Sequence, residues 1–200
     1  MSGSLRPATP FEFIAWEDAQ ATKHEFDGDI IHAMTGGTAA HAGIQRNIII
    51  ALGNRLRGRT CQVYGSEFKI IVAGAVRYPD AFVVCSTHSP RATVADDPVV
   101  VFEILSASSV RVDRVEKLRE YQLTPSIQRY VMFEQDIAMA TVFSRQGSEW
   151  VGRVRYEDDV LDMPEIDISV PMSEFYLDID LATAPKSKSP PSEEGGETSR

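Results

Sequence analysis

The sequence predicts a mixed α/β (α+β) fold, in which a mixed central β-sheet is flanked by helices. Apolar residues recur every three or four positions from Ala39 to about Arg57, which is typical of a long amphipathic helix. The run Val99–Leu105 is apolar except for one glutamate, which is typical of a central strand covered on both faces. With 200 residues, 43% of them hydrophobic, the chain is long enough for one domain with a sizeable core.

A short helix and a hairpin are predicted before the long helix. Thr9 is suited to cap a helix that has Pro10 at its first position. The segment 23–34 is expected to form a hairpin that turns at Asp27-Gly28. The long helix then ends at Gly58, because glycine readily adopts the left-handed conformation found at helix ends.

The remainder of the chain is expected to supply the sheet. The predicted strands are 61–64 paired with 67–72, then 76–85 after a turn at 73–75, then 99–105, 128–133 paired with 137–143, and 150–156. A helix over 110–123, capped by Ser108 or Ser109 and closed by Pro125, separates the two groups of strands. Residues 172–175 are expected to form a terminal helical turn.

We expect the folded domain to span residues 9–181, between a flexible N-terminus (1–8) and a disordered tail (182–200). The tail is rich in Pro, Ser, Gly and Glu and has no large apolar residue, so it cannot offset the entropy lost on ordering. No apolar run approaches the ~18 residues of a membrane span, and the first ten residues lack the apolar stretch of a signal peptide. These features predict a cytoplasmic protein with no membrane partner.

The cysteine content and the net charge bear on the redox state of the protein and on how it could bind nucleic acid. Cys61 and Cys85 are the only cysteines, and they lack CxxC spacing, so we expect two reduced, packed thiols rather than a disulfide. The net charge, 20 − 29 = −9, argues against a protein that holds nucleic acid through bulk positive charge alone.

Two carboxylates are unusual for residues of a protein core. Glu103 lies within the apolar run of the predicted central strand, where an unpaired charge would cost several kcal/mol. Such a group is normally protonated, paired with a cation or bound to a metal, and the alternative to a site is a structural ion pair. Asp80 follows Pro79 at the start of another apolar strand. If the two strands are neighbours, the two carboxylates face one cation, and oxygen ligands suit Mg²⁺ or Mn²⁺.

Lys117 lies on the predicted helix 110–123. The spacing of Val115, Leu118 and Tyr121 turns these three residues toward the sheet and leaves Lys117 at the border of that face. From spacing alone, a surface pair with Asp113 is the favoured interpretation. Glu25 in the hairpin and His41 in the first turn of the long helix are weaker candidates, and a lone histidine there is more often a packing residue.

Taken together, these segments resemble the Uma2 family of endonucleases within the PD-(D/E)XK, restriction-endonuclease-like superfamily. The motifs that carry the resemblance follow one another in a fairly specific order and span about residues 11–181. They are His24-Glu25-Phe26-Asp27-Gly28, Ala40-His41, Tyr78-Pro79-Asp80, Phe102-Glu103-Ile104-Leu105-Ser106, Asp113-Arg114-Val115-Glu116-Lys117 and Tyr121.

This resemblance implies a restriction-endonuclease-like mixed sheet flanked by helices, with Asp80 and Glu103 as metal-binding carboxylates. The superfamily's lysine position after Glu103 holds Leu105, and in this family the lysine has moved to the following helix, where it is Lys117. Lys69 is the competitor, because a register change of one residue decides whether it faces Asp80.

The expected function is metal-dependent hydrolysis of DNA phosphodiester bonds. Asp80, Glu103 and the backbone carbonyl of Ile104 would hold one or two Mg²⁺ or Mn²⁺ ions, and Lys117 would orient the attacking water. Glu25 and His41 are outer-shell candidates, and a homodimer is expected by family analogy. The alternatives are a catalytically silent nuclease-like fold that acts as a protein-interaction module, and a nuclease for RNA.

Two further expectations depend on the surroundings of this site. Arginines of the two helices could line one cleft for the substrate, although ordinary solvation of the helices explains them as well. They are Arg46, Arg55, Arg57, Arg59, Arg111, Arg114 and Arg119. Without metal, Asp80 and Glu103 would repel each other, so Glu103→Gln is expected to stabilise the apo-protein by about 1 kcal/mol. A structural pair between Glu103 and a lysine predicts the opposite sign.

Overall fold

The computed structural model describes residues 7–105 and 113–181, and it confirms the predicted mixed α/β fold. The predicted caps at Ser108 or Ser109 and the predicted tail 182–200 lie outside the described residues. The main sheet has six strands in the order β11-β10-β9-β8-β6-β3, and a smaller sheet has five in the order β2-β1-β5-β4-β7. Strands β12 and β13 form a separate hairpin.

The described part of the chain contains four α-helices, a π-helix (η1) and a 3₁₀-helix (η2) among its strands. The helices are α1 (Pro10–Glu17), α2 (Ala39–Leu56), η1 (Asp113–Lys117), α4 (Leu118–Leu123), η2 (Pro164–Ile166) and α5 (Met172–Phe175). The strands are β1 (His24–Phe26), β2 (Ile31–Ala33), β3 (Gln62–Gly65), β4 (Lys69–Val72), β5 (Ala75–Arg77), β6 (Ala81–Val84), β7 (Val94–Ala95), β8 (Pro98–Ile104), β9 (Arg129–Phe133), β10 (Met139–Gln146), β11 (Glu149–Tyr156), β12 (Val160–Met163) and β13 (Ile168–Pro171). No helix within the described residues is both long enough and apolar enough to cross a membrane.

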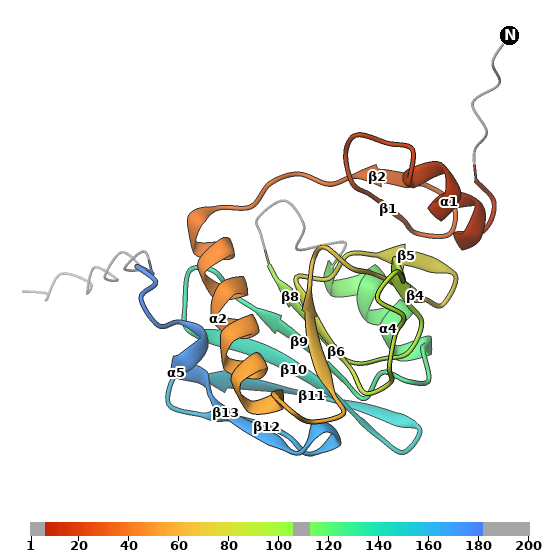
Figure 1. Cartoon of the computed structure of the whole chain (residues 1–200). Helices are drawn as coiled ribbons and strands as arrows, with labels where there is room; N and C mark the ends of the chain where they lie inside the picture. Colours follow the sequence, from red (N-terminus) through yellow and green to blue (C-terminus); the bar gives the residue numbers. More distant parts are fainter. Residues whose placement is uncertain (1–6, 106–112, 182–200) are drawn as a thin grey trace, which may run out of the picture.

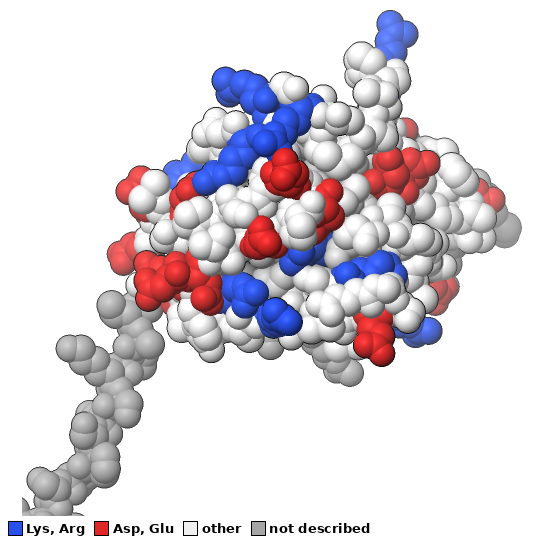
Figure 2. Space-filling view, turned by 90° about the horizontal axis from the view of Figure 1, so that it is seen from below, with Lys and Arg blue, Asp and Glu red and all other residues white. Residues whose placement is uncertain are grey.

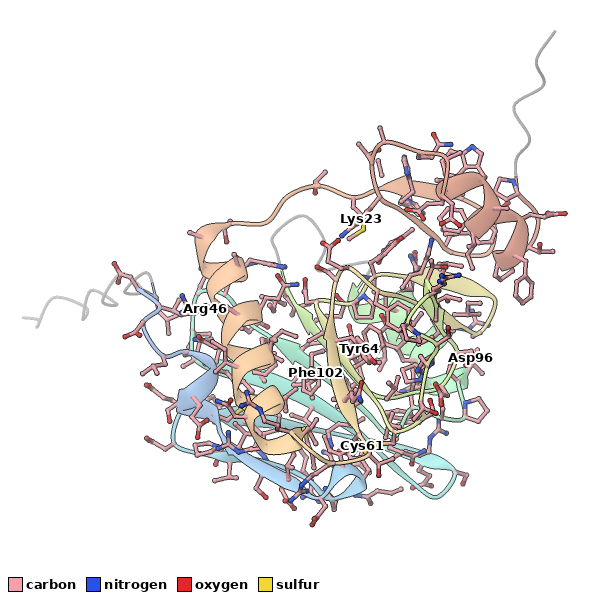
Figure 3. All side chains as sticks on the ribbon, viewed as in Figure 1. Lys23, Arg46, Cys61, Tyr64, Asp96 and Phe102 are labelled. Atoms are coloured by element: carbon pink, nitrogen blue, oxygen red, sulfur yellow. A yellow bond between two sulfur atoms is a disulfide. The ribbon has the colours of Figure 1, made fainter. Side chains whose placement is uncertain are left out.

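The six-stranded sheet separates two apolar cores (Figure 1). On one face, Ile44, Ile48 and Leu52 of α2 pack against the sheet, and the β12–β13 hairpin and α5 close the same core. Phe102 of β8 points into this core beside α2 (Figure 3). On the other face, Tyr121 of α4 and the smaller sheet complete the second core. Strand β8 is covered on both sides, as its apolar run predicted.

The N-terminal elements form a smaller unit at one end of the molecule (Figure 1). Phe13 of α1 and Phe26 of β1 stack with ring centroids 5.3 Å apart, and Val76 of β5 completes this third core. Thr9 caps α1 by accepting a hydrogen bond from the amide of Glu12, as predicted. Strand β1 pairs with β5, so the unit is continuous with the smaller sheet.

One predicted strand is wrong in a way that matters for the site. The segment 76–85, expected as a single strand, is divided into β5 and β6, which belong to different sheets. Tyr78-Pro79-Asp80 forms the link between them, and Pro79 has no amide hydrogen with which to continue a strand ladder. The apolar pattern runs through the link because all of its residues except Asp80 are buried.

The expectation of two free thiols is also wrong, because Cys61 and Cys85 form a disulfide. Strands β3 and β6 are antiparallel and pair Gln62 with Val84. This register places Cys61, just before β3, directly opposite Cys85, just after β6. The sequence has no spacing motif for such a pair, since the two residues meet only through the sheet register.

Removing this cross-link is expected to lower the free energy of unfolding by about 3 kcal/mol. The disulfide joins residues 24 positions apart, and closing such a loop restricts the unfolded chain. Chemical denaturation of the parent and of Cys61→Ser/Cys85→Ser measures the difference. The parent in reductant serves as the control and should match the double variant. Equal unfolding midpoints for the oxidised parent and the double variant would contradict the prediction.

Candidate functional site

Asp80 is held at the start of β6 by contacts to both of its carboxylate oxygens. His41 Nε2 lies 2.8 Å from Oδ1, and the amide of Ile104 donates to Oδ2 at 2.7 Å. Gln45, on the same helix as His41, donates to the backbone carbonyl of Asp80 at 2.9 Å. Asp80 is therefore fixed between the first turns of α2 and the end of β8.

Glu103 lies near the end of β8 and is only 5% exposed. Its Oε1 accepts a hydrogen bond from Lys117 Nζ at 2.9 Å and one from the hydroxyl of Tyr121 at 3.0 Å. Burial raises the pKa of Tyr121 well above its ordinary value, and the Glu103 charge raises it further, so Tyr121 keeps its proton at neutral pH. The buried carboxylate predicted from the sequence thus has a cation and a hydroxyl as partners.

The two predicted carboxylates belong to the same end of neighbouring strands. Strands β6 and β8 are antiparallel and pair Ala81 with Phe102, a register that continues to Asp80 opposite Glu103. The hydrogen bond from the Ile104 amide to Asp80 also ties the start of β6 to the residue after Glu103. The sequence predicted this neighbourhood of Asp80, Glu103 and Ile104, and the structure brings all three together.

The helical spacing predicted Lys117 at the border of the helix face that covers the sheet. In the structure Lys117 is buried. Lys117 is 6% exposed, whereas Val115, expected to face the sheet, is 65% exposed. The reason is that residues 113–117 form a π-helix, whose i→i+5 hydrogen bonds shift the register of side chains relative to an α-helix. The interpretation of Lys117 as an exposed surface residue is therefore wrong, and its ammonium contacts Glu103.

The expected sign of the Glu103→Gln effect is therefore reversed. The Lys117 ammonium lies 2.9 Å from the Glu103 carboxylate, so removing the carboxylate charge weakens an attraction. We expect Glu103→Gln to lower the apo free energy of unfolding by about 1–3 kcal/mol, because the Lys117 charge stays buried. Denaturation in EDTA measures this change, and a stabilised variant would restore the expectation of facing like charges.

Lys69, the competing lysine, is bound elsewhere. It lies on β4 of the smaller sheet, where its Nζ donates to Glu17 at 2.7 Å and to Asp18 at 3.0 Å. The hydroxyl of Tyr78 donates to the same Glu17 carboxylate. Of the two candidate lysines, the structure brings Lys117 to Glu103 and Lys69 to the carboxylates at the end of α1.

Lys69 is expected to make the fold sensitive to alkaline pH. Burial lowers the pKa of Lys69, but its hydrogen bonds to Glu17 and Asp18 outweigh burial and raise the pKa from 10.5 to about 12. A raised pKa means that this stabilisation is complete below pH 10.5 and is lost as the pH rises toward 12. Lys69→Met should lower the free energy of unfolding by about 1–3 kcal/mol at neutral pH. The variant should also lose less stability than the parent as the pH rises from 10.5 to 12.

Denaturation curves at several pH values between 9 and 12 would measure this difference. Burial also raises the pKa of Tyr78 to about 12, and the Lys69 charge lowers it in part, so both proteins are compared in a Tyr78→Phe background to isolate Lys69. An equally steep alkaline loss in Lys69→Met and in the parent would contradict the prediction.

Glu25 reaches the site from the N-terminal unit. Its Oε1 lies 3.5 Å from Lys117 Nζ and accepts a hydrogen bond from the Tyr78 amide at 2.9 Å, and Arg77 lies 3.3 Å from Oε2. Burial raises the pKa of Glu25, but the charges of Lys117 and Arg77 and the Tyr78 amide outweigh it, so the pKa lies below its ordinary value. Glu25 is therefore ionised at neutral pH and contacts two cations.

His41 contacts Asp80, and its ring position depends on a glycine. A Cβ atom at Gly37 would lie 2.9 Å from two atoms of the His41 ring, so only glycine leaves room for the ring in this position. The two outer-shell candidates therefore lie at different parts of the site: His41 beside Asp80, and Glu25 beside Lys117.

Several residues of the site were not found from the sequence. Arg77 is 1% exposed and makes a bidentate ion pair with Glu120, at 2.8 and 2.6 Å, in addition to its contact with Glu25. Gln45 is another, and for Tyr121, which the sequence placed on the sheet-facing side, the hydrogen bond to Glu103 was not predicted. The signal for Arg77 was a charged residue within an apolar strand, the same signal that identified Glu103.

Three of the seven arginines considered for a basic cleft have partners within the protein. Arg55 makes a bidentate ion pair with Glu174, at 2.9 and 2.7 Å, and Arg59 contacts Asp167. Arg46 projects from α2 away from the sheet and donates to the neighbouring Asn47 (Figure 3). Arg111 and the side chain of Arg114 lie outside the described part of the chain. The α2 arginines after its first turns are thus partly neutralised and lie toward α5.

The donor set at Asp80 and Glu103 fits a hard divalent cation. Two carboxylates and the following backbone carbonyl of Ile104 are oxygen donors, as Mg²⁺ and Mn²⁺ prefer, and the two cysteines are joined in the disulfide. The Glu103 carboxylate already has one cationic partner, the Lys117 ammonium.

Two curated relatives from Synechocystis sp. (strain ATCC 27184 / PCC 6803 / Kazusa) resemble the chain along much of its length. "Uncharacterized protein slr1290" is 28% identical over 172 residues, which covers 84% of this chain and 90% of that protein. "Uncharacterized protein sll1609" is 26% identical over 135 residues, which covers 64% and 75% of the two chains. Neither name states an activity.

A solved structure shares the fold. The crystal structure of a "putative nuclease belonging to DUF820" from Anabaena variabilis ATCC 29413 superposes with a TM-score of 0.66 and 17% sequence identity, covering 85% of this chain and 98% of that one. In the scan against protein families, residues 10–172 match the Uma2 family, described as "Putative restriction endonuclease". Because this match includes both strands that carry Asp80 and Glu103 and the helix that carries Lys117, the chain belongs to the Uma2 family.

Proposed function

We propose that this protein is an endonuclease that hydrolyses DNA phosphodiester bonds with the help of Mg²⁺ or Mn²⁺. Asp80, Glu103 and the backbone carbonyl of Ile104 hold the cation, and Lys117 is the catalytic lysine. The observation that carries the proposal is the contact of Lys117 Nζ with Glu103 at 2.9 Å, beside an Asp80 fixed to the Ile104 amide. Family membership supports a nucleic acid as the substrate.

Each side chain has a defined task in this reaction. A divalent cation held by Asp80, Glu103 and the Ile104 carbonyl would lower the pKa of a coordinated water and polarise the phosphate. Asp80 presents its carboxylate in one orientation, because His41 and the Ile104 amide hold both of its oxygens. Lys117 donates hydrogen bonds to the attacking water and offsets the negative charge that develops on the phosphate.

The protein's charge is consistent with local recognition of the substrate. The net charge is −9, and the face that Figure 2 shows carries both basic and acidic side chains, with one short run of basic ones and no field of one sign across it. Affinity that rests on few phosphate contacts would depend only weakly on salt. A homodimer, by family analogy, and a cytoplasmic location, expected from the sequence features, remain part of the proposal.

Cleavage by the pure protein tests this proposal. Labelled duplex DNA, single-stranded DNA and RNA are incubated with Mg²⁺, Mn²⁺ or EDTA, each beside Asp80→Ala. Cleavage of DNA that needs the metal and Asp80 supports the proposal. Cleavage of RNA alone would assign the site to RNA, and intact substrates together with no metal binding would favour a silent nuclease-like interaction module.

A further inference from the structure

Lys117 lies between two carboxylates that come from different parts of the fold. Glu103 Oε1, on the central sheet, is 2.9 Å from its Nζ, and Glu25 Oε1, on the N-terminal unit, is 3.5 Å from it. Both carboxylates are almost fully buried, with side chains 6% and 12% exposed. A short movement of one ammonium group would therefore exchange its stronger partner for its weaker one.

Glu25 is held in place independently of Lys117. The Tyr78 amide donates to its Oε1 at 2.9 Å, and Arg77 lies 3.3 Å from Oε2. Arg77 is itself fixed by its bidentate pair with Glu120, which lies one helical turn after Lys117. The second partner of Lys117 is thus part of a rigid, buried frame that also holds the helix carrying Lys117.

This arrangement answers a difficulty in the proposed function, on which the inference rests. A cation bound by Glu103 competes with the Lys117 ammonium for the negative charge of the same carboxylate, because both are positive. If Lys117 had only Glu103, metal binding would leave a buried ammonium without its counter-charge, which is costly. Glu25 supplies a counter-charge that metal binding does not remove.

We infer that Glu25 is a positioning residue: it takes over Lys117 when Glu103 turns to the metal, and so keeps the lysine beside the reacting phosphate. In this role Glu25 acts through Lys117 and does not contact the cation through a water. Arg77 keeps the Glu25 carboxylate ionised and oriented. The N-terminal unit therefore contributes to the site a carboxylate that the nuclease core itself does not supply.

Metal affinity measured without substrate tests this role. Isothermal titration with Mn²⁺ compares the parent with Glu25→Gln, which keeps the shape and removes the charge. Because metal binding then weakens the pairing of Lys117 with Glu103 and the Glu25 charge is absent, the Mn²⁺ dissociation constant should rise roughly tenfold. Glu17→Gln is the matched control, since Glu17 is a buried carboxylate of the same unit that pairs with Lys69, and it should bind Mn²⁺ within about twofold of the parent.

The second half of the test is a double-mutant cycle with Lys117→Met. If Glu25 acts through Lys117, Glu25→Gln should change the Mn²⁺ affinity of Lys117→Met by less than about twofold. An undiminished effect in the Lys117→Met background would overturn the inference and assign Glu25 to the cation directly. A purely structural role would give equal effects in both backgrounds, which also overturns it.

A second variant covers the case in which Glu25→Gln does not fold. Glu25→Asp keeps the charge for Arg77 but shortens the side chain by one methylene, so it should fold and weaken Mn²⁺ binding several-fold. Parent-like Mn²⁺ affinity in either folded variant overturns the inference alone. A parent that binds Mn²⁺ but leaves DNA and RNA intact overturns the proposed function alone, and a parent that binds no Mn²⁺ overturns both.

Discussion

Asp80→Ala is expected to reduce metal-dependent DNA cleavage by more than about 100-fold, with little change in the fold. Loss of a residue that only supports a metal ligand typically costs 10- to 100-fold, and loss of a ligand should cost more. The substitution also removes the contacts of the Asp80 carboxylate with the Ile104 amide and His41, while β6 and β8 stay paired through the sheet ladder. Initial cleavage rates at saturating Mn²⁺ measure the effect, and Glu103→Ala should have an effect of the same size.

Asp27→Ala is the matched control for this prediction. Asp27 also contacts a histidine, His32, at 2.9 Å, and it also accepts backbone hydrogen bonds, from Asp29 and Ile30. It lies in the β1–β2 turn, so its loss should affect the stability of the hairpin but leave cleavage unchanged. Full cleavage by Asp80→Ala, or an equal loss in Asp27→Ala, would refute the metal-ligand assignment.

The fold was predictable where local patterns decide the structure. Thr9-Pro10, Asp27-Gly28 and Gly58 each mark an element boundary, and both glycines have the positive φ that such positions require, +98° and +76°. The apolar run of β8 identified a strand covered on both faces, and the glutamate within it identified the site. In these segments each local preference agrees with the tertiary structure.

The errors arose where partners distant in the sequence decide the outcome. Cys61 meets Cys85 only because of the register between β3 and β6, which no local pattern specifies. The burial of Lys117 depends on a π-helix, whereas the spacing argument assumed α-helical geometry. The segment 76–85 was expected to be one strand, but at residues 78–80 the chain passes from the smaller sheet to the six-stranded sheet.

The ion pairs around Arg77 also depend on partners that are distant in the sequence. A buried arginine on a strand, such as Arg77, requires a counter-charge, but the sequence does not indicate which carboxylate supplies it. The structure assigns two, Glu25 and Glu120, from elements 52 and 43 positions away along the chain. The choice between Lys69 and Lys117 had the same form. The structure shows Lys69 bound by Glu17 and Asp18 at the end of α1 and Lys117 in contact with Glu103, and the catalytic role of Lys117 stays a prediction.

Lys117→Met is expected to lower the turnover number about 100-fold while Mn²⁺ binding is retained or becomes tighter. The substitution keeps the length of the side chain and removes the donor proposed to act on the water and the phosphate, and loss of one such donor typically costs 10²- to 10³-fold. Metal binding should not suffer, because the ammonium that competes with the cation for Glu103 is gone. Without metal, the variant should be less stable than the parent, since Glu25 and Glu103 lose the cation between them.

Lys69→Met separates this role from a general effect of removing a buried lysine. Both lysines are buried and both form ion pairs with carboxylates, but Lys69 pairs with Glu17 and Asp18, away from Glu103. Its substitution should lower the free energy of unfolding and leave the turnover number within about twofold of the parent. Both variants are assayed at saturating Mn²⁺ and at a temperature where circular dichroism shows them folded. If Lys69→Met lost turnover as severely as Lys117→Met, the assignment of Lys117 as the catalytic lysine would be wrong.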